Sequence, residues 1–222
     1  MSTDKSPLAL KVDIVSDVVC PWCIIGYLQL QEALQRLNGQ FCVDYRWHPF
    51  ELSPNMPPEG QNLREYMSMK YGSTPEQSSA SHQRLTQLGE ALGFQFNYSG
   101  DTRMVNTFHA HQLLHWAFGQ ALQTELKLAL FDSFFTRQED VSDTDTLVAV
   151  AQRVNLPGDE AHAVLAEGRY AEIVREAEQA WRDREVHAVP TFLLQGRYQV
   201  PGAQDADTFE RILRRLLPSE AA

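Results

Sequence analysis

The sequence predicts an α/β protein in which a β-sheet is interrupted by an inserted all-helical domain. A strand, a helix and a strand open the chain, nearly everything in the middle has helical periodicity, and two strands and a helix close it. The opening and closing elements are expected to complete one sheet across the insert. We therefore assign residues 1–60 and 185–222 to one discontinuous sheet domain. Residues 61–184 form the helical domain, whose last helix is expected to pack back on the sheet.

The first sixty residues predict a strand, a helix and a strand followed by a linker. Apolar and polar residues alternate over about 9–17, which indicates a strand, and apolar residues recur at steps of three and four over 21–38, which indicates a helix. Alternation returns over 41–48, in a strand that most simply lies parallel to the first. Residues 48–60 hold four prolines, and so many rigid residues cannot continue a strand or a helix.

The middle of the chain, from about 62 to 184, predicts a series of helices. Thr74-Pro75-Glu76-Gln77 combines an N-cap, a proline at the first helical position and a capping-box glutamine, so a helix begins there. Further helices are expected around 113–117, over 122–135, after the cap at 142–145 and over 170–181. The charged stretch from Arg175 to Arg184 is most simply a solvated helix face.

The tail returns to strand character. Residues 189–200 predict a β-hairpin that turns at Gly196. An amphipathic helix follows and stops at Pro218.

The composition excludes several classes of protein. With 43% hydrophobic residues, the 222-residue chain can bury a sizeable core. Its net charge of −10 and the lack of a basic stripe argue against nucleic acid, whose phosphates require clusters of lysine and arginine. The polar N-terminus, and an apolar run broken by Lys11 and Asp13, predict neither a signal peptide nor a membrane span. We therefore expect a cytoplasmic protein that binds no membrane.

The candidate chemistry lies in Cys20-Pro21-Trp22-Cys23, at the junction between the first strand and the first helix. Proline suits the first helical position, which puts Cys20 at the N-cap and Cys23 about one turn further in. Cβ atoms three residues apart on a helix lie roughly 5–6 Å apart and a disulfide needs about 3.8 Å, so a small adjustment closes the bond. A cross-link over so short a loop stabilises a fold little, which favours a redox-active disulfide over a structural one.

Cys20 is expected to be the nucleophile of the pair. The unpaired N–H groups and the dipole at a helix N-terminus stabilise an anion by roughly 0.3–2 kcal/mol, and one pKa unit is about 1.4 kcal/mol. From a free-thiol value of about 8.5, the pKa of Cys20 should fall to about 7. Cys23 lies deeper in the helix and is expected to be the less exposed, resolving thiol.

Zinc binding is the main alternative for the pair, since CxxC is also a zinc half-site. A structural zinc site needs two more ligands, and the sequence offers no second close pair, so no metal is expected. The third cysteine, Cys42, alternates with Phe41 and Val43 and so shares its strand face with Asp44. A free cysteine there is more simply a structural thiol than a redox group.

Together with the distant Val189-Pro190-Thr191-Phe192, the Cys20-Pro21-Trp22-Cys23 motif resembles the DsbA-like family of thioredoxin-fold proteins, and most closely its cytosolic FrnE-type branch. CxxC alone is a weak motif, but the likeness extends over nearly the whole chain. It includes Asp17 through Gly26, Pro49-Phe50-Glu51-Leu52, Asn106-Thr107-Phe108, Ala110-His111, Leu130-Phe131, Phe134-Phe135-Thr136 and Gly202-Ala203-Gln204. Two positions depart from the family pattern: Gln112 stands in place of arginine and Ala188 in place of glycine.

The resemblance implies a thioredoxin-like sheet with a helical insertion, and a cis peptide bond between Val189 and Pro190 that faces the dithiol. It also implies a thiol–disulfide oxidoreductase. In this activity Cys20 attacks a substrate disulfide and Cys23 resolves the mixed disulfide. In the reducing cytoplasm the pair should rest as a dithiol and reduce its substrates.

The same resemblance sets expectations for the surroundings of the dithiol. Pro21, Trp22, Val189 and Pro190 would shape the platform on which a substrate lies. No cofactor is required beyond the disulfide, with glutathione as an optional co-substrate. The expected partner is a protein or small molecule that carries a disulfide or a thiol, and the chain is expected to be a monomer or a homodimer.

Three further residues are candidates, each with a structural alternative. Asp17 is either a solvated carboxylate at the end of the strand or an acid–base partner for thiol exchange. Asn106 and His111 are expected on one helix, the one that the resemblance singles out. His111 is more simply a partly buried ring with satisfied hydrogen bonds than a substrate contact. Trp22 either stacks on a substrate or covers the disulfide.

Two other functions stay open. Thioredoxin-fold isomerases with the same insert act on a small aromatic or chromene carboxylate with glutathione, and they resemble the chain around Asn106, Thr107 and His111. They typically carry serine at the position of Cys20, and Cys23 has no task in their chemistry. The non-enzymatic alternative is a chaperone-like binding module that uses the helical cleft, with the disulfide as a latch.

Overall fold

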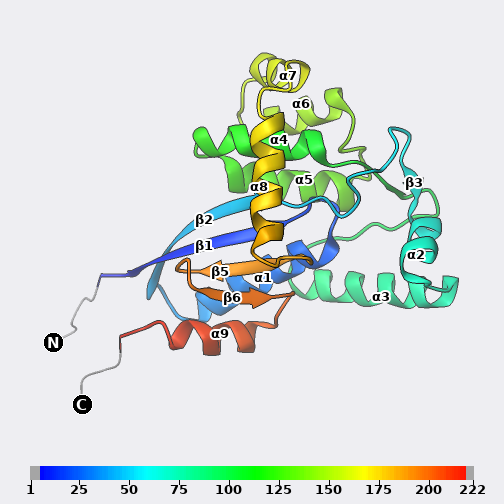
Figure 1. The fold of residues 1–222 in the computed structure, drawn as a ribbon. Helices are drawn as coiled ribbons and strands as arrows, with labels where there is room; N and C mark the ends of the chain where they lie inside the picture. The colour runs from blue at the N-terminus through cyan, green and yellow to red at the C-terminus, as the bar shows by residue number, and fades with distance from the viewer. Residues whose placement is uncertain (1–5, 219–222) are drawn as a thin grey trace.

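The computed structural model describes residues 6–218, which contain a mixed four-stranded sheet (Figure 1). Its strands are β1 (Leu8–Ser16), β2 (Phe41–Pro49), β5 (Thr191–Leu194) and β6 (Tyr198–Pro201). They lie in the order β2-β1-β5-β6. β2 runs parallel to β1, as predicted, whereas β5 is antiparallel to β1 and β6 to β5. Strands from both ends of the chain thus complete one sheet, which confirms the predicted α/β architecture.

The first helix connects the two parallel strands. The helices outside the insert are α1 (Pro21–Arg36) and α9 (Ala206–Arg214). α1 begins at its proline, as predicted, but ends two residues before the predicted limit of 38. Asn38 and Gly39 have left-handed φ angles of 46° and 75°, which cannot continue a helix.

The insert is helical apart from one short ladder. Its helices are α2 (Leu63–Tyr71), α3 (Pro75–Ala91), α4 (Phe108–Gly119), α5 (Gln123–Phe131), α6 (Thr144–Arg153), α7 (Gly158–Ala166) and α8 (Ala171–Asp183). The predicted capping box is present at the start of α3, between Thr74 and Gln77. The helix predicted over 122–135 ends as α5 and continues as a π-helical turn, η1 (Asp132–Thr136). Within residues 6–218, no helix has both the length and the apolar character that crossing a bilayer requires.

The short ladder pairs β3 (Gln61–Asn62) with β4 (Arg103–Met104). The sequence does not predict it, because two residues per strand carry no alternating pattern. The division of the chain at 60/61 and 184/185 stays a prediction, and the outermost residues of the predicted sheet domain, 1–5 and 219–222, lie outside the described part.

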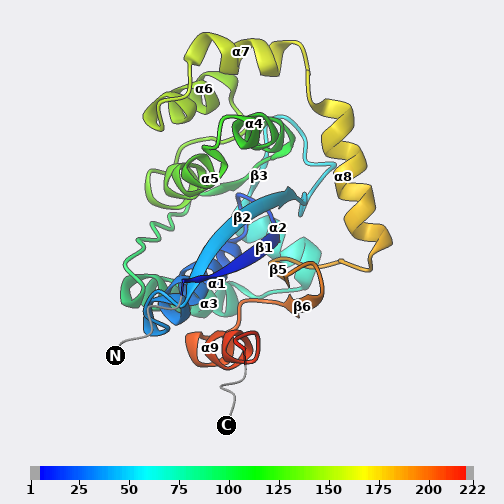
Figure 2. The same cartoon turned by 90° about the vertical axis from the view of Figure 1, so that its left-hand side faces the viewer.

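Helices cover both faces of the sheet (Figure 2). α1 and α9 lie on one face, where Tyr27 of α1 packs against Tyr45 of β2 with ring centroids 5.6 Å apart. α8 lies over the opposite face and buries Trp181 against Val15 and Leu193. The last helix of the insert therefore packs back on the sheet, as predicted.

The charged stretch of α8 is not the fully solvated face that the sequence predicts. Glu178 is only 2% exposed and forms an ion pair with Arg175 at 3.0 Å. Arg175 also pairs with buried Glu51 of the linker, and its guanidinium lies 3.8 Å from the ring centroid of Phe108. The prediction is wrong because a buried acid on another segment requires a cation, which α8 supplies.

Candidate active site

The site is built where β1 ends and α1 begins. Cys20 is the N-cap residue of α1, with φ −92° and ψ 110°. Cys23 lies in the first turn, where its N–H donates to the carbonyl oxygen of Cys20 at 3.1 Å. Both are free thiols, and Pro21 holds the first helical position between them. The predicted placement of the motif is therefore confirmed.

The segment before β5 faces the dithiol. The peptide bond between Val189 and Pro190 is cis, which confirms the expectation from the resemblance. The Sγ atom of Cys20 donates to the carbonyl oxygen of Val189 over 3.7 Å. Two segments 169 residues apart in the sequence thus meet at the reactive sulfur.

The two thiols ionise as a coupled pair. Cys20 is 4% exposed and Cys23 is fully buried. The pKa of the Cys20 thiol is raised well above its usual value, because Cys20 donates a hydrogen bond to Cys23 and because it is buried. Burial also raises the pKa of Cys23, but the hydrogen bond from Cys20 and the positive charge of Lys127 outweigh it. The net pKa of Cys23 is therefore lowered.

The expected pKa of about 7 for Cys20 is wrong as an assignment to that sulfur. The helix dipole is one influence among several, and nearby groups favour charge on Cys23. These groups are the positive charge of Lys127 and the hydroxyl of Ser16. The two thiols ionise as a pair, so neither has a pKa of its own that its helix position alone determines. Of the two cysteines, Cys20 borders a cavity whose lining does not include Cys23.

This cavity has a volume of about 350 Å³ and lies between the dithiol and the insert. Cys20, Pro21 and Trp22 form one wall, Val189 lies beside them, and side chains of α2 and α3 close the other side. The lining is mostly apolar and aromatic, which is typical of sites for small molecules or apolar side chains. The guanidinium of Arg84 lies 5.7 Å from the ring centroid of Trp22. Three of the four predicted platform positions, Pro21, Trp22 and Val189, therefore line one cavity, and Pro190 is not among its lining residues.

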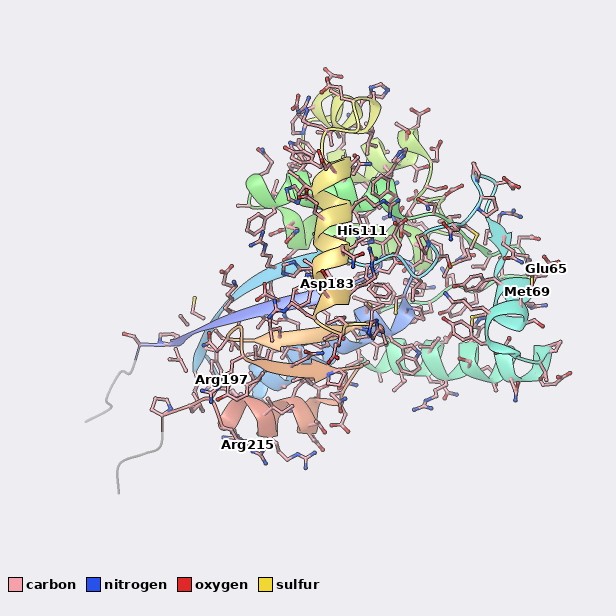
Figure 3. All side chains as sticks on the ribbon, viewed as in Figure 1. Glu65, Met69, His111, Asp183, Arg197 and Arg215 are labelled. Atoms are coloured by element: carbon pink, nitrogen blue, oxygen red, sulfur yellow. The ribbon has the colours of Figure 1, made fainter. Side chains whose placement is uncertain are left out.

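Asp17 is not the solvated carboxylate that one alternative describes. It is fully buried, and its Oδ2 accepts from the N–H of Leu52 at 2.7 Å. Its Oδ1 lies 3.4 Å from Nε2 of His111, which is 3% exposed and lies between the sheet and the helices of the insert (Figure 3). The same Nε2 lies 3.2 Å from the carbonyl oxygen of Phe50. Nε2 of His111 is therefore held by groups of the protein, in agreement with the structural alternative.

Asn106 does not lie on a helix, so the expectation that it shares one with His111 is wrong. It lies two residues before α4, and its Oδ1 accepts from the N–H of Phe108 at 2.9 Å. Its Nδ2 donates to Oε1 of Glu51 at 3.2 Å. Asn106 thus anchors the linker to the start of α4, and it is not among the residues that border the cavity at Cys20.

Lys127 is the functional candidate that sequence reasoning missed. It is fully buried in α5, and its Nζ donates to the carbonyl oxygen of Ser16 at 3.4 Å. Nζ also lies 5.4 Å and 5.1 Å from the ring centroids of Trp47 and Phe131. Burial lowers its pKa to about 8. A signal was present, because Lys127 stands on the apolar face of α5 with Leu126, a position where a charged residue is unusual.

Three other residues that the sequence analysis discusses, Cys42, Gln112 and Ala188, do not line the cavity at Cys20. Gln112 is buried at 1% exposure and Ala188 is exposed, so neither departure from the family pattern forms a wall of the cavity. Cys42 is exposed on β2, on the same face as Asp44, as predicted. Among the residues that the structure describes, no three or more His, Cys, Asp or Glu side chains are grouped as a metal site.

Comparison with known proteins gives one family. A model of the DSBA-like thioredoxin domain matches residues 11–214. The crystal structure of a probable DsbA oxidoreductase from Streptomyces coelicolor is 30% identical, with a TM-score of 0.87 over 96% of this chain and 94% of that one.

Two more distant structures share the fold. A 2-hydroxychromene-2-carboxylate isomerase has a TM-score of 0.65 at 15% identity, over 93% of this chain and 95% of that one. The cytosolic disulfide reductase DsbM from Pseudomonas aeruginosa, solved with glutathione, has a TM-score of 0.62 at 16% identity, over 93% and 98%. At these identities the likeness concerns the fold alone.

Proposed function

Because the chain belongs to the family of DSBA-like thioredoxin domains, we propose that it catalyses thiol–disulfide exchange through Cys20 and Cys23. One observation carries the proposal. Cys20 borders a cavity of about 350 Å³, and the N–H of Cys23 in the first turn of α1 donates to the carbonyl oxygen of Cys20 at 3.1 Å. A sulfur that meets substrate and a buried sulfur beside it are the two groups that a dithiol mechanism requires.

The proposed reaction reduces a substrate disulfide in two steps. The sulfur of Cys20, as thiolate, attacks one sulfur of the substrate, and the second substrate sulfur leaves and takes up a proton. The sulfur of Cys23, once deprotonated, attacks Cys20 and displaces the remaining substrate thiolate. Overall the dithiol of Cys20 and Cys23 gives two electrons and two protons to the substrate disulfide, so the substrate ends as two thiols and the enzyme as a Cys20–Cys23 disulfide.

The backbone at Val189 is proposed to position the substrate. Its carbonyl oxygen accepts from Cys20 in the free protein. An extended substrate segment offers a backbone N–H that can take the place of the thiol at this oxygen, in the manner of an added strand. Trp22, which lines the same cavity as Cys20 and Val189, would then contact the side chain next to the substrate sulfur.

The substrate is proposed to be a disulfide carried by a protein or a small molecule, and the location the cytoplasm. DsbM, which shares the fold, is a cytosolic disulfide reductase, and this supports the setting. There the glutathione and thioredoxin pools keep thiols reduced, so the dithiol would be the resting form and reduction the net direction. Glutathione, present in the DsbM structure, is the proposed co-substrate that regenerates the dithiol.

The test compares wild type with Cys20→Ser and Cys23→Ser in the reduction of a peptide disulfide. Wild type should reduce it, Cys20→Ser should lose the activity, and Cys23→Ser should accumulate a mixed disulfide at Cys20, visible by mass spectrometry. Retained activity in Cys20→Ser would overturn the proposal. So would a wild-type protein in which oxidised glutathione forms no Cys20–Cys23 bond.

The same variants separate the two alternatives. A glutathione-dependent isomerase takes its thiolate from glutathione, so isomerisation of an aromatic carboxylate would survive in both variants. A chaperone-like module would bind an unfolded protein equally well without either cysteine. The fold shared with the chromene carboxylate isomerase supports the first alternative, but it gives the buried Cys23 no role.

A further inference from the structure

A second, smaller cavity is lined by the buried residues His111 and Lys127. It has a volume of about 130 Å³ and is enclosed by β2, α4, α5 and α8. Five basic side chains take part in its lining: Arg46, His48, His111, His115 and Lys127. The basic groups in this lining offer hydrogen-bond partners to water, and the volume suits several water molecules. We call it the rear cavity, and we call the cavity that Cys20 borders the substrate-side cavity. The two cavities have no lining residue in common.

Lys127 and His111 connect the rear cavity to the dithiol. Both are buried, both line the rear cavity, and both also face the end of β1. Lys127 donates to the carbonyl oxygen of Ser16, and His111 reaches the carboxylate of Asp17. Cys20 therefore borders the substrate-side cavity, while Lys127 and His111, which contact the end of β1 before it, border the rear cavity.

The thiol of Cys23 has no contact with solvent to which it could lose its proton. It is fully buried and does not line the substrate-side cavity. To attack Cys20 in the resolving step, its thiol must lose a proton. The amine of Lys127 is a suitable base, because buried lysines lose their proton far more readily than exposed ones. No carboxylate of residues 6–218 lies within ion-pair distance of Nζ.

We infer that Lys127 accepts the proton of Cys23 during the resolving step and passes it to solvent through the rear cavity. This inference rests on the proposed function. The S–H bond of Cys23 breaks as an N–H bond forms on neutral Lys127, and the thiolate then attacks Cys20 while the substrate thiolate leaves. Lys127, now an ammonium, returns to the amine by giving its proton to water in the rear cavity. In the oxidative direction each transfer runs in reverse.

Several charged or ionisable groups influence whether Lys127 is an amine or an ammonium. Asp17 and the two sulfurs face Lys127 from the β1–α1 junction and favour the ammonium. His111 and His115 lie on α4 and His48 and Arg46 on β2, all of them around the rear cavity. Burial opposes the ammonium and brings the pKa of Lys127 to about 8, so both protonation states are accessible near neutral pH.

The experiment follows the mixed disulfide in a single turnover of the full chain with a peptide disulfide, by acid quench and mass spectrometry. In Lys127→Met, formation of the mixed disulfide should keep its wild-type rate. Its resolution at pH 7 should slow tenfold or more, as expected for loss of a general base. The pH profile of resolution should move to higher pH, which a purely structural effect would not produce. Methionine matches the length and apolar stem of lysine, so the variant should fold, as circular dichroism will show.

A second experiment tests whether the proton leaves through the rear cavity, with variants that keep Lys127. Ala177→Leu adds bulk to the rear cavity from α8, whereas Ala180→Leu adds the same bulk on the exposed face of that helix. Ala177→Leu should slow resolution, and Ala180→Leu should not. Equal rates for the two variants would overturn the route, and a wild-type rate and pH profile in Lys127→Met would overturn the role of the lysine. A wild-type protein that forms no mixed disulfide would overturn the proposed function itself, which is a different outcome.

Discussion

The Nε2 atom of His111 lies 3.4 Å from Oδ1 of Asp17, and both side chains are almost wholly buried. The other carboxylate oxygen accepts from the N–H of Leu52, so the end of β1, the linker and α4 meet at one residue. Burial raises the pKa of Asp17, but the hydrogen bond and charge of His111 and the N–H of Leu52 outweigh it. The net pKa is lowered, so Asp17 is ionised in the interior at neutral pH.

Replacing Asp17 by asparagine should change how stability depends on pH. In wild type the folded pKa lies below the unfolded value of about 3.9, so the carboxylate stabilises the fold above that value. The contribution is lost as the pH falls through the folded pKa. Asp17→Asn keeps an oxygen for Leu52 but no charge, so its free energy of unfolding should fall less between about pH 5 and about pH 2.

Urea unfolding across that range measures the difference between the two proteins. Asp44→Asn, which changes an exposed carboxylate on β2, is the control and should follow wild type. Parallel curves for wild type and Asp17→Asn would contradict the assignment of a buried, ionised Asp17.

Replacing Arg175 by methionine should destabilise the protein at neutral pH. Arg175 bridges Glu51 and Glu178, whose side chains are each 1% exposed, and its loss leaves two buried carboxylates without their cation. Arg175 itself is 45% exposed, so solvent screens part of the effect, and we expect a loss of about 1–3 kcal/mol in the free energy of unfolding.

The sign of the pH effect distinguishes this loss from simple loss of packing. Burial and the charge of Glu178 already raise the pKa of Glu51, and removal of Arg175 raises it further. Protonation of Glu51 then removes an unpaired buried charge from the variant. The loss in its free energy of unfolding relative to wild type should therefore shrink as the pH falls from 7 to about 5. Arg182→Met, which removes a cation 4.0 Å from Glu178, should cost much less. A deficit that does not depend on pH would count against the buried pair.

The parts of the fold that the sequence predicts are those determined by local patterns. The β1–α1–β2 unit follows from alternation, from helical spacing and from Pro21, all of which act within a few residues. The capping box at Thr74 is local in the same sense. The cis bond before Pro190 was not visible in any local pattern and came from family resemblance.

The parts that could not be predicted depend on partners far along the chain. The pKa expected for Cys20 considers only its own helix, whereas Lys127 approaches the dithiol from a helix more than one hundred residues later and favours charge on Cys23. The sequence predicts a solvated Arg175 because its partner Glu51 is 124 residues away. Spacing along one element does not reveal which buried charges a fold brings together.

Gln123 should be among the most stabilising polar residues of the insert. Its Oε1 accepts from the N–H of Trp47 at 2.9 Å, and its Nε2 donates to the carbonyl oxygens of Trp47 and Leu114 at 3.0 and 3.1 Å. The side chain thus takes the place of a neighbouring strand at the edge of β2. Gln123→Leu leaves these buried backbone groups unpaired and should lower the free energy of unfolding by about 2–4 kcal/mol.

Urea unfolding at pH 7 measures that loss. Gln87→Leu, on the exposed face of α3, makes the same chemical change in solvent and is the control. If the two variants unfold at the same urea concentration, Gln123 does not hold the sheet edge.

Lys127→Met should be more stable than wild type at neutral pH, and the advantage should disappear in alkali. Burial lowers the folded pKa of Lys127 from 10.5 to about 8, so between these values the unfolded state binds more protons than the folded state. Wild-type stability should therefore rise with pH over this interval, by up to about 3 kcal/mol, and the methionine variant should lack the rise. The comparison is made on the oxidised proteins, because the Cys20–Cys23 disulfide removes both thiols from the titration. Wild-type and variant stabilities that run parallel from pH 7 to about pH 10.5 would show that Lys127 keeps an ordinary pKa, and a lysine of that kind could not accept a proton from Cys23 near neutral pH.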